Sequence, residues 1–437
     1  MRNPAQLVVV AFVALIALGT LLLCLPWAFD PGRSGPVLDS LFLSTSAVTV
    51  TGLSTFDVTN LSLFGELVVL ILIQIGGFGI MTIGSLLALF AARRMGLRQR
   101  MLAQAEIGVV DHREMRSLIG GIAVITLMVE AAVALVVAVR LWTYYDVELG
   151  AALYEGLFHS VAAFNNAGIA LYRDNLIGFS GDPFIVLSLS GALILGGLGF
   201  PVIMQLVRKV RPRHWNLHTR LTIAGTGALV VTGPLLVGMF EWGNPATLGP
   251  MGLGEKLLSA WFQGVSPRTA GFNVVDVGAM EEPTLLVTTI LMFIGAGPAS
   301  TGGGIKVTTF ALLGFVLWSE VRGDTDVNVL HRRVPATVIR QAVTVVILAI
   351  GSVMAVTTVL LVSADLTLTP ALFESVSAFA TVGLSTGITA DLPDVSKIAL
   401  ILLMLAGRVG PTTLVTALAY RQRLQRFHYP QERPIIG

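Results

Sequence analysis

Charged residues are scarce in this chain of 437 residues, because Lys, Arg, Asp and Glu together make up only 12% of it. Soluble domains carry about 25% charged residues, so the composition argues against a soluble fold. Cysteine is scarcer still, since Cys24 is the one example in the sequence. A lone cysteine cannot form an internal disulfide or a cysteine metal cluster, and redox chemistry is therefore not supported.

Long apolar runs take the place of charge. Hydrophobic residues make up 54% of the chain, and runs of about 20 residues recur, each long enough to cross a hydrocarbon core about 30 Å thick. A transmembrane β-barrel would instead need alternating segments of about 10 residues. The run over residues 7–27 exceeds a signal-peptide core and has no clear cleavage site after it, so we interpret it as the first span. The sequence predicts an all-α, multi-pass protein of the cell membrane.

The basic residues gather in a few places. Of the 28 Lys and Arg, 20 lie at Arg2 and within residues 93–116, 208–220, 322–340 and 421–433. The positive-inside rule places these clusters, and with them both chain termini, on the cytoplasmic side. Contact with membrane lipid is expected beside this topological role, whereas nucleic acid is not an expected partner.

Three apolar segments separate each basic cluster from the next, as 7–27, 37–48 and 63–92 do for the first pair. Three full crossings would put the next cluster on the opposite side, so one segment of each three cannot cross. The middle segment has about 10 to 14 residues, which is typical of a re-entrant helix. The sequence therefore predicts four repeats of span, re-entrant pore helix and span around one central pore, with bounds 1–116, 117–219, 220–336 and 337–437.

A small, polar stretch with a glycine ends each middle segment. An aromatic residue stands ten positions before each glycine, namely Phe42, Phe158, Trp261 and Phe373. The glycines are 116, 103 and 112 residues apart, and the shared pattern indicates an internal fourfold repeat. The candidate ion ligands are Thr49, Val50, Thr51 and Gly52; Asn165, Asn166, Ala167 and Gly168; Thr269, Ala270 and Gly271; and Thr381, Val382 and Gly383.

Physical chemistry gives these stretches a common task. Non-helical backbone inside a membrane is tolerated only where it lines a cavity or is buried in protein, so the four stretches are expected to meet around one axis. Each pore helix points its C-terminal partial negative charge, about half an electron, toward that axis, which favours a cation. Backbone carbonyls can replace the hydration shell of the ion, and glycine reaches the required backbone angles without a Cβ clash.

The four stretches resemble the pore loops of the Trk/Ktr/HKT superfamily of potassium transporters, and the likeness covers nearly the whole chain. Further marks of that family are Gln74-Ile75-Gly76-Gly77-Phe78-Gly79-Ile80-Met81-Thr82 and Ser300-Thr301-Gly302-Gly303-Gly304-Ile305-Lys306. The first pore loop comes without extra leading spans, and Tyr429-Pro430-Gln431-Glu432 stands near the end of the chain. In both features the chain is most similar to the Ktr-type membrane subunit, KtrB. Phe78, where leucine is common, and the alanine that opens the fourth loop are small departures.

The resemblance implies channel-like uptake of potassium, with K+ bound at Gly52, Gly168, Gly271 and Gly383 and sodium as a further candidate ion. It also implies a homodimer that is gated by a cytosolic nucleotide-binding regulatory subunit of the KtrA type. The chain itself offers no nucleotide site, because residues 297–306 resemble a phosphate loop only superficially. No organic cofactor is expected.

Second glycine clusters follow in the outer spans, at 76–77, 196–197, 295–304 and 407–410, and are expected to interrupt them; close helix packing explains them equally well. Residues 295–304 cannot continue a helix, since each Gly costs about 1 kcal/mol and Pro about 3 kcal/mol relative to Ala. The resemblance places this loop as an intramembrane gate below the filter. Its candidate residues are Gly297, Ser300, Thr301, Gly302, Gly303, Gly304 and Lys306, with Arg408 expected to bind the loop carbonyls. A packing kink, and for Arg408 a structural anchor between repeats, are the alternatives.

The remaining buried polar residues are given structural roles. Glu130 is expected to form structural hydrogen bonds rather than an ion path. Arg268 is expected to pack behind the third loop, because a cation facing the pore would repel the ion. His159 and Cys24 are expected in the core.

Two other functional classes are weighed against a channel-like pore. A sodium-coupled secondary transporter with broken helices is the main alternative, but such folds typically use inverted repeats, whereas the charge pattern gives parallel ones. An intramembrane enzyme would need a nucleophile and base, or paired acids, at matching depth. Glu130, Lys306 and Arg408 form no such set, so the chain is not expected to be an enzyme.

Overall fold

The computed structural model describes residues 4–30, 35–93 and 112–410. Several sequence predictions therefore lie outside the described residues: Arg2, most of the basic cluster 93–116, the cluster 421–433 and the terminal motif 429–432. Within the described chain, long and short helices alternate, and almost no β-structure accompanies them.

The described helices fall into four successive groups, each with a long helix, a short helix and then one further helix or a broken pair. The first group is α1 (Pro4–Leu23), α2 (Val37–Thr49) and α3 (Leu63–Arg93). The second is α5 (His112–Tyr144), α6 (Leu149–Phe164), α7 (Pro183–Leu198) and α8 (Phe200–Val207). The third is α9 (Leu217–Glu241), α10 (Leu253–Val265), α11 (Glu282–Phe293) and α12 (Val307–Arg322). The fourth is α13 (Ala336–Ser363), α14 (Leu368–Ala380) and α15 (Asp394–Val409).

Short elements complete the chain. An antiparallel hairpin of β1 (Asn328–Val329) and β2 (Arg332–Arg333) joins α12 to α13. Single turns of 3-10 helix lie in the connections, at η1 (Pro26–Ala28), η2 (Val58–Asn60), η3 (Ile177–Phe179), η4 (Pro212–His214), η5 (Val277–Ala279) and η6 (Thr389–Asp391).

The long helices carry the membrane-spanning signal. Among the described residues, three are individually long and apolar enough to cross a membrane, over Gly120–Tyr144, Leu217–Glu241 and Ala336–Ser363. The bent pair α7 and α8 would make a fourth span. Further apolar helices are shorter, at Val8–Leu23, Val37–Thr49, Leu63–Gly79 and Glu282–Phe293. Large apolar side chains such as Leu127 and Met128 on α5 and Ile347 on α13 are exposed, as expected of surfaces that face lipid.

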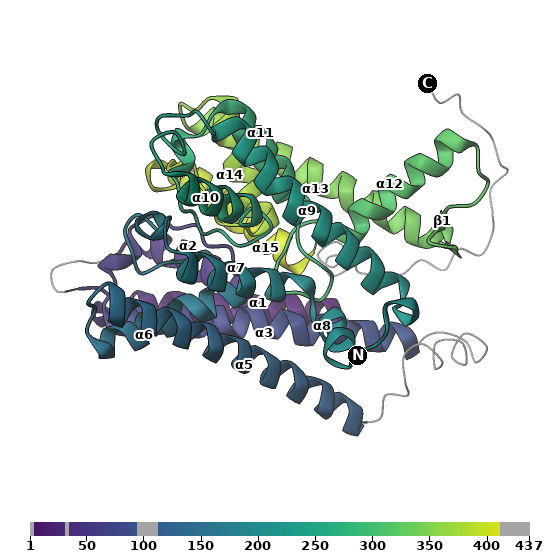
Figure 1. Cartoon of the computed structure of the whole chain (residues 1–437), viewed down its shortest axis with the longest axis horizontal. Coiled ribbons are helices and arrows are strands. Elements are labelled where there is room, and N and C mark those ends of the chain that lie inside the picture. Colours follow the sequence, from purple (N-terminus) through teal and green to yellow (C-terminus); the bar gives the residue numbers. More distant parts are fainter. Residues whose placement is uncertain (1–3, 31–34, 94–111, 411–437) are drawn as a thin grey trace.

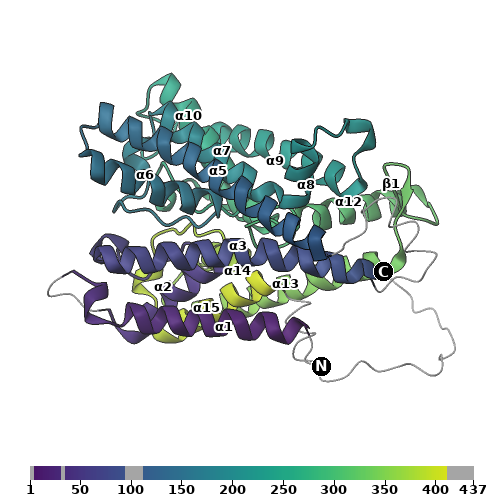
Figure 2. The same ribbon diagram turned by 90° about the horizontal axis from the view of Figure 1, so that it is seen from below.

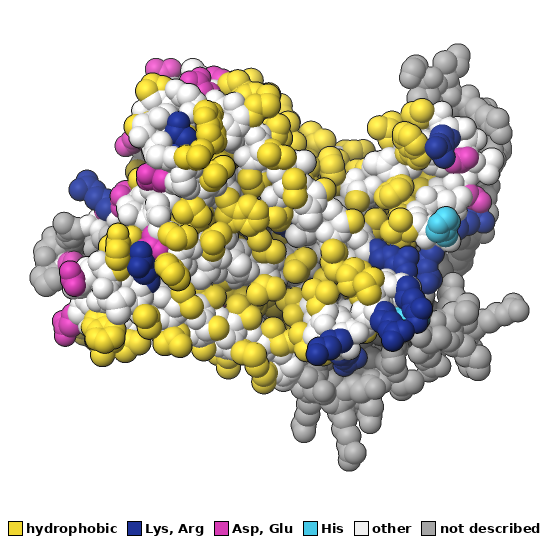
Figure 3. All heavy atoms as spheres, viewed as in Figure 1, with side chains coloured by type: hydrophobic (Ala, Val, Ile, Leu, Met, Phe, Trp, Pro, Cys, Tyr) yellow, Lys and Arg dark blue, Asp and Glu magenta, His cyan; other side chains and the backbone are white. Residues whose placement is uncertain are grey.

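The four short helices share one end of the molecule. In both Figure 1 and Figure 2, α2, α6, α10 and α14 lie in the left half of the view, beside the longer helices. Figure 3 shows a group of Lys and Arg side chains near α8 and β1 on the right, whereas most of the visible Asp and Glu lie on the left. The short helices therefore lie toward the more acidic end of the molecule.

The predicted interruption of every outer span is wrong for the first repeat, because α3 continues through Gly76 and Gly77. These glycines instead permit close packing: a Cβ on Gly76 would lie 2.1 Å from the Val48 carbonyl oxygen. Likewise, a Cβ on Gly196 would lie 1.9 Å from the Phe164 carbonyl oxygen, and one on Gly407 would lie 1.7 Å from the Phe379 carbonyl oxygen. Close packing against a backbone carbonyl thus accounts for the glycine at each of these three positions.

The second outer span does break, three residues after Gly196. α7 and α8 meet at an angle of 105°, and Gly199 between them has a φ of +87°, which favours glycine. The third outer span is non-helical over residues 294–306, as predicted for the glycine-rich loop. Upstream, α7 begins where Asp182 accepts the backbone N–H groups of Phe184 and Ile185, at 2.9 and 3.3 Å, which is a standard N-terminal cap.

Cys24 is exposed at the surface, so its prediction as a core residue is wrong. The helix register explains the error, because neighbouring Leu23 takes the fully buried position. His159 is buried as predicted, with 1% of its surface exposed. The three phenylalanines that precede filter glycines, Phe42, Phe158 and Phe373, are fully buried.

Candidate ion-conduction site

The four glycine stretches begin at the buried C-terminal ends of the short helices. α2 ends at Thr49, α6 at Phe164, α10 at Val265 and α14 at Ala380. The last turns of all four helices are buried, so the backbone that follows is shielded from lipid, as required of non-helical chain at membrane depth.

The glycines of the four stretches form a closed ring. A Cβ built on Gly52 would lie 2.3 Å from the carbonyl oxygen of Ala167, next to Gly168. A Cβ on Gly168 would lie 2.7 Å from the Cα of Gly271. A Cβ on Gly271 would lie 2.2 Å from the carbonyl oxygen of Val382, and one on Gly383 would lie 2.2 Å from the carbonyl oxygen of Thr51. Four segments separated by more than 100 residues therefore meet around one axis, with no room for a side chain at any of the four positions.

The backbone angles of the four stretches repeat as well. Gly52, Gly168, Gly271 and Gly383 have φ values of +98°, +65°, +74° and +95°. Two residues before each glycine a second residue has positive φ: Val50 at +54°, Asn166 at +60°, Thr269 at +72° and Thr381 at +50°. Alternating handedness of this kind turns successive carbonyl groups to one side of the chain, which is the arrangement that coordinates a dehydrated cation.

The positive φ at these second positions was not predicted, since Val and Thr rarely adopt it. Backbone strain of this kind costs about 1–3 kcal/mol per residue and persists where the surrounding structure enforces it. The sequence signal that exists is indirect: each such residue follows the last turn of a pore helix, where left-handed residues commonly terminate helices.

Backbone N–H groups of three of the stretches donate hydrogen bonds to the short helix that precedes each stretch. The N–H of Thr51 donates to the Ser46 carbonyl at 2.7 Å, that of Ala167 to Ala162 at 2.8 Å, and that of Val382 to Ser377 at 2.9 Å. Side chains add to this, because the N–H of Gly52 donates to Ser46 Oγ at 2.9 Å and that of Gly383 to Ser377 Oγ at 3.1 Å. Ser46 and Ser377 support the ring and were not among the predicted residues.

No group of three or more His, Cys, Asp or Glu residues able to hold a metal ion occurs in the described part of the chain. A cation at the ring would therefore be bound by backbone carbonyls, with the partial negative ends of the four pore helices beneath them.

Two of the polar residues in or beside the stretches point away from the axis. The Asn165 side chain donates to Gln74 Oε1 at 2.8 Å and to Glu130 Oε1 at 3.2 Å. Gln74 Nε2 also donates to Glu130, at 3.3 Å. Glu130 thus takes part in hydrogen bonds as expected, and these bonds make the Asn165 side chain a support of the second loop. Arg268 donates to Thr226 Oγ1 on α9 at 3.3 Å, behind the third loop as predicted.

The non-helical segment 294–306 lies directly against the loops. A Cβ on Gly302 would lie 2.1 Å from Thr269 Oγ1, and one on Gly303 would lie 2.3 Å from Thr381 Oγ1. Thr301 Oγ1 donates to the Phe164 carbonyl at 3.3 Å. The segment thus contacts the third and fourth glycine stretches and the end of α6, directly before the second stretch.

Other residues of the segment fasten it to the break between α7 and α8. The N–H of Gly297 donates to the Gly197 carbonyl at 2.8 Å and that of Thr301 to the Gly196 carbonyl at 3.2 Å. Ser300 is fully buried, and its hydroxyl finds no partner within the described residues. Gly304 has a φ of +65° just before the chain turns into α12.

Two cationic side chains bind carbonyls of this segment. Arg408, 5% exposed, donates through one terminal nitrogen to the Thr301 carbonyl and through the other to the Gly76 carbonyl on α3 at 3.2 Å. Lys306 Nζ donates to the carbonyls of Gly302 and Gly303 at 2.5 and 3.3 Å. The predicted contact between Arg408 and the loop carbonyls is present, and Gly76 is an additional partner.

Comparison with known proteins shows the family to which this chain belongs. The family of cation transport proteins named TrkH matches residues 1–424. The chain belongs to the TrkH family. This TrkH-family protein is 36% identical to Ktr system potassium uptake protein B of Bacillus subtilis (strain 168) over 436 residues, covering 100% of this chain and 97% of the relative. It is 35% identical to Ktr system potassium uptake protein B of Vibrio alginolyticus, covering 99% of this chain and 94% of the relative.

Two further comparisons bear on ion type and fold. The potassium/sodium uptake protein NtpJ of Enterococcus hirae is 31% identical over 444 residues, covering 100% of this TrkH-family chain and 97% of the relative. A crystal structure of the potassium transporter TrkH from Vibrio parahaemolyticus matches with a TM-score of 0.75 at 20% identity, covering 96% of this chain and 85% of that one. The family and the apolar helices together make the protein a multi-pass membrane protein, as predicted.

Proposed function

We propose that this TrkH-family protein takes up potassium through the ring formed by Gly52, Gly168, Gly271 and Gly383, as the ion-translocating subunit of a Ktr-like system. The main support for this proposal is that these four glycines, each with positive φ, pack against one another's loops in a closed ring. A ring of backbone carbonyls without carboxylates suits a monovalent cation that must bind and leave again. Relatives that are themselves called potassium uptake proteins support the choice of ion.

Uptake by living cells tests this proposal. A strain that lacks its own potassium uptake systems should grow at low potassium when it expresses this chain, and it should accumulate rubidium. The same cells should be assayed with and without sodium, because one relative is called a potassium/sodium uptake protein. This assay tests whether uptake depends on sodium. Correctly inserted protein that supports neither growth nor rubidium uptake would contradict the proposal; uptake that requires sodium would favour the broken-helix secondary transporter.

The segment 295–304 is proposed to be the gate. Its contacts with the third and fourth glycine stretches and with the end of α6 support a position across the path beside the ring, where the bonds from Arg408 and Lys306 would hold it. Hydrogen bonds from charged donors contribute about 1.5–3 kcal/mol each, which is a moderate barrier to displacement. Deleting residues 299–302 should then raise basal rubidium flux per inserted molecule, whereas a segment of purely structural importance would lower it.

The remaining assignments are proposals about organisation. Each of the units 1–116, 117–219, 220–336 and 337–437 contributes one filter loop, and the basic end shown in Figure 3 faces the cytoplasm. The chain is proposed to form a homodimer that binds a cytosolic nucleotide-binding subunit on this face. The relatives' description as parts of a Ktr system supports a partner. A purified chain that is monomeric, and whose flux ignores a co-expressed partner with nucleotide, would contradict this arrangement.

A further inference from the structure

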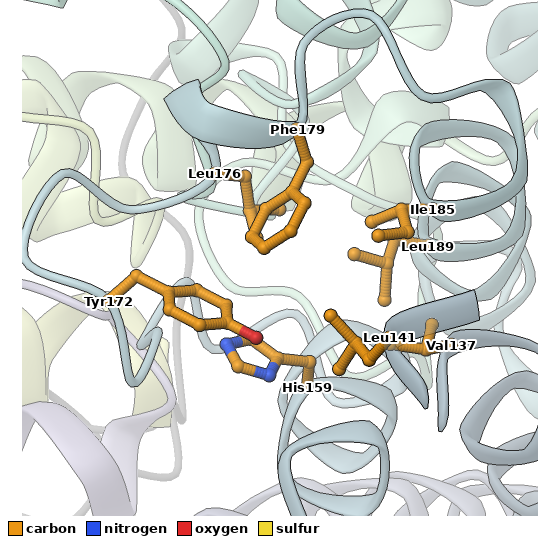
Figure 4. A pocket seen from close by; sticks show the side chains of 8 residues that line it. All are labelled: Val137, Leu141, His159, Tyr172, Leu176, Phe179, Ile185 and Leu189. Carbon is orange, nitrogen blue, oxygen red and sulfur yellow. The ribbon is translucent and has the colours of Figure 1, made fainter. Parts of the chain in front are cut away.

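The connection that follows the second filter loop is firmly anchored. Figure 4 shows the Tyr172 ring lying over the imidazole of His159, and the two rings stack at 4.8 Å and 9°. The His159 ring also accepts the N–H of Leu171 through Nε2 at 3.2 Å. Leu176 and Phe179 point into an apolar hollow that Val137, Leu141, Ile185 and Leu189 line from the other side. Residues 171–179 are therefore fixed at both ends.

Asn175 lies between these anchors and reaches the filter. Its Nδ2 donates to the carbonyl oxygen of Gly168 at 3.3 Å, and its Oδ1 accepts the N–H of Asn273 at 3.4 Å. The next residue, Leu176, donates its N–H to the Asn273 carbonyl at 3.1 Å. Asn273 stands two residues after Gly271, so the Asn175 amide links the filter glycine of the second repeat to the chain that leaves the third.

This contact makes the ring asymmetric. Within the described chain, hydrogen bonds reach the carbonyl oxygen of Gly168 but not those of Gly52, Gly271 or Gly383. The positions seven residues after those other glycines are Thr59, Gly278 and Ala390, and none of these has an amide side chain. One of four equivalent carbonyls is therefore fixed in direction by a donor, and the partial positive charge of that donor lies beside it.

We infer that Asn175 is a specificity-determining positioning residue, which holds the Gly168 carbonyl back and so keeps the ring of the four glycines wide enough for a potassium-sized ion. The inference rests on the proposed potassium uptake. Without the tether, the Gly168 carbonyl is free to turn toward the axis and approach a smaller ion. Loss of the tether should then favour sodium relative to potassium or its analogue rubidium.

Two substitutions separate the two bonds of Asn175. Its φ of +58° is left-handed, and glycine and aspartate both adopt that conformation readily. Asn175→Gly removes both side-chain bonds without strain. Asn175→Asp keeps an acceptor for the Asn273 N–H and removes the donor to Gly168. Because the new carboxylate attracts every cation, the ratio of rubidium to sodium uptake is the readout and not the rate.

Asn60 provides a matched control. It follows the first filter loop at nearly the same spacing and is half-buried, and its side chain makes no hydrogen bond within the described residues. Asn60→Gly and Asn60→Asp therefore repeat the same chemical changes away from any filter carbonyl. All four variants are compared as full-length chains in cells without other potassium uptake systems, with uptake normalised to the amount of inserted protein.

The expected result is a fall of about threefold or more in the rubidium-to-sodium ratio for both Asn175 variants, which is the order of effect of one hydrogen bond, and no change for the Asn60 variants. An unchanged ratio in Asn175→Asp overturns the inference, whether or not Asn175→Gly differs, because the donor to Gly168 is then irrelevant. Equal changes in the Asn60 variants overturn it too. Failure of the unaltered chain to take up rubidium would instead contradict the proposed function.

Discussion

The filter ring and the segment 294–306 are both non-helical backbone buried in the protein, yet they are held in different ways. In the ring, each loop bonds mainly to its own pore helix, as the N–H of Thr51 does to Ser46 and that of Val382 to Ser377. The segment is closed on itself by the bonds of Lys306 to Gly302 and Gly303, and it is tied to other elements by Arg408 and by the carbonyls at the α7–α8 break. Local bonds are lost only when the pore helix unfolds, whereas a few long-range bonds can be exchanged while every helix stays intact. This difference supports the proposal that the ring selects the ion and that the segment moves.

The largest effect is expected from a side chain placed in the ring. Gly383→Asp puts a Cβ 2.2 Å from the Thr51 carbonyl oxygen at a φ of +95°, where any side chain is strained. Rubidium uptake should fall by about tenfold or more, from strain of about 1–3 kcal/mol together with the added charge. The measurement is uptake per inserted molecule in the deficient strain. Gly150→Asp is the control, because Gly150 is exposed with nothing within 4 Å of an added Cβ. Normal uptake by Gly383→Asp would show that the ring does not lie on the ion path.

A change in the opposite direction is expected from the segment. Arg408→Ala removes the bonds to the Thr301 and Gly76 carbonyls, so basal flux should rise by about tenfold and depend less on the regulatory partner, given the strength of charged hydrogen bonds. Rubidium flux through purified, reconstituted protein with and without the partner measures this. Arg173→Ala, at a side chain 91% exposed, is a control for loss of an arginine. A lower flux with unchanged ion selectivity would make Arg408 an anchor instead.

A smaller change in the ring should alter selectivity before it abolishes uptake. Gly52→Ser adds a hydroxymethyl group 2.3 Å from the Ala167 carbonyl oxygen at a φ of +98°. The neighbouring loop must shift, and this displaces carbonyl groups of the ring slightly. Because binding of the preferred ion is then modestly weakened, the ratio of rubidium to sodium uptake should fall by about threefold. Competition of sodium with rubidium uptake provides the measurement. If uptake and ratio both match the unaltered chain, Gly52 is not part of the selective site.

The smallest effect is expected behind the ring. Glu130→Gln preserves the shape of the side chain and retains an acceptor for the amides of Gln74 or Asn165. Flux should stay within about twofold of the unaltered chain, while thermal stability falls slightly, because one of two buried acceptors becomes a donor. Uptake assays and detergent-solubilised melting curves test the two expectations. A loss of flux of about tenfold without loss of stability would instead place Glu130 on the ion path.

Much of the site could be predicted because its signals are local. The glycines at 52, 168, 271 and 383 follow short apolar helices in a pattern that needs no knowledge of neighbours, and the glycine-rich loop excludes a helix by composition alone. The error over the outer spans arose because their glycine clusters look alike in the sequence but have different neighbours in the structure. Gly76 and Gly77 remain helical because the adjacent pore helix packs against them, and a sequence window does not contain that neighbour.

Composition, spacing and charge by themselves determined that this is a helical membrane protein, and they predicted the four short helices, the four glycines that follow them and the glycine-rich loop. Tertiary structure decided which groups meet: that Gly52 contacts the second loop and Gly383 the first, that Arg408 also reaches Gly76, and that Asn175 holds the Gly168 carbonyl. It also imposed positive φ on Val50 and Thr381. The physical reason is that propensities and hydropathy act over a few neighbouring residues, whereas contacts between loops more than 100 residues apart depend on how the helices pack.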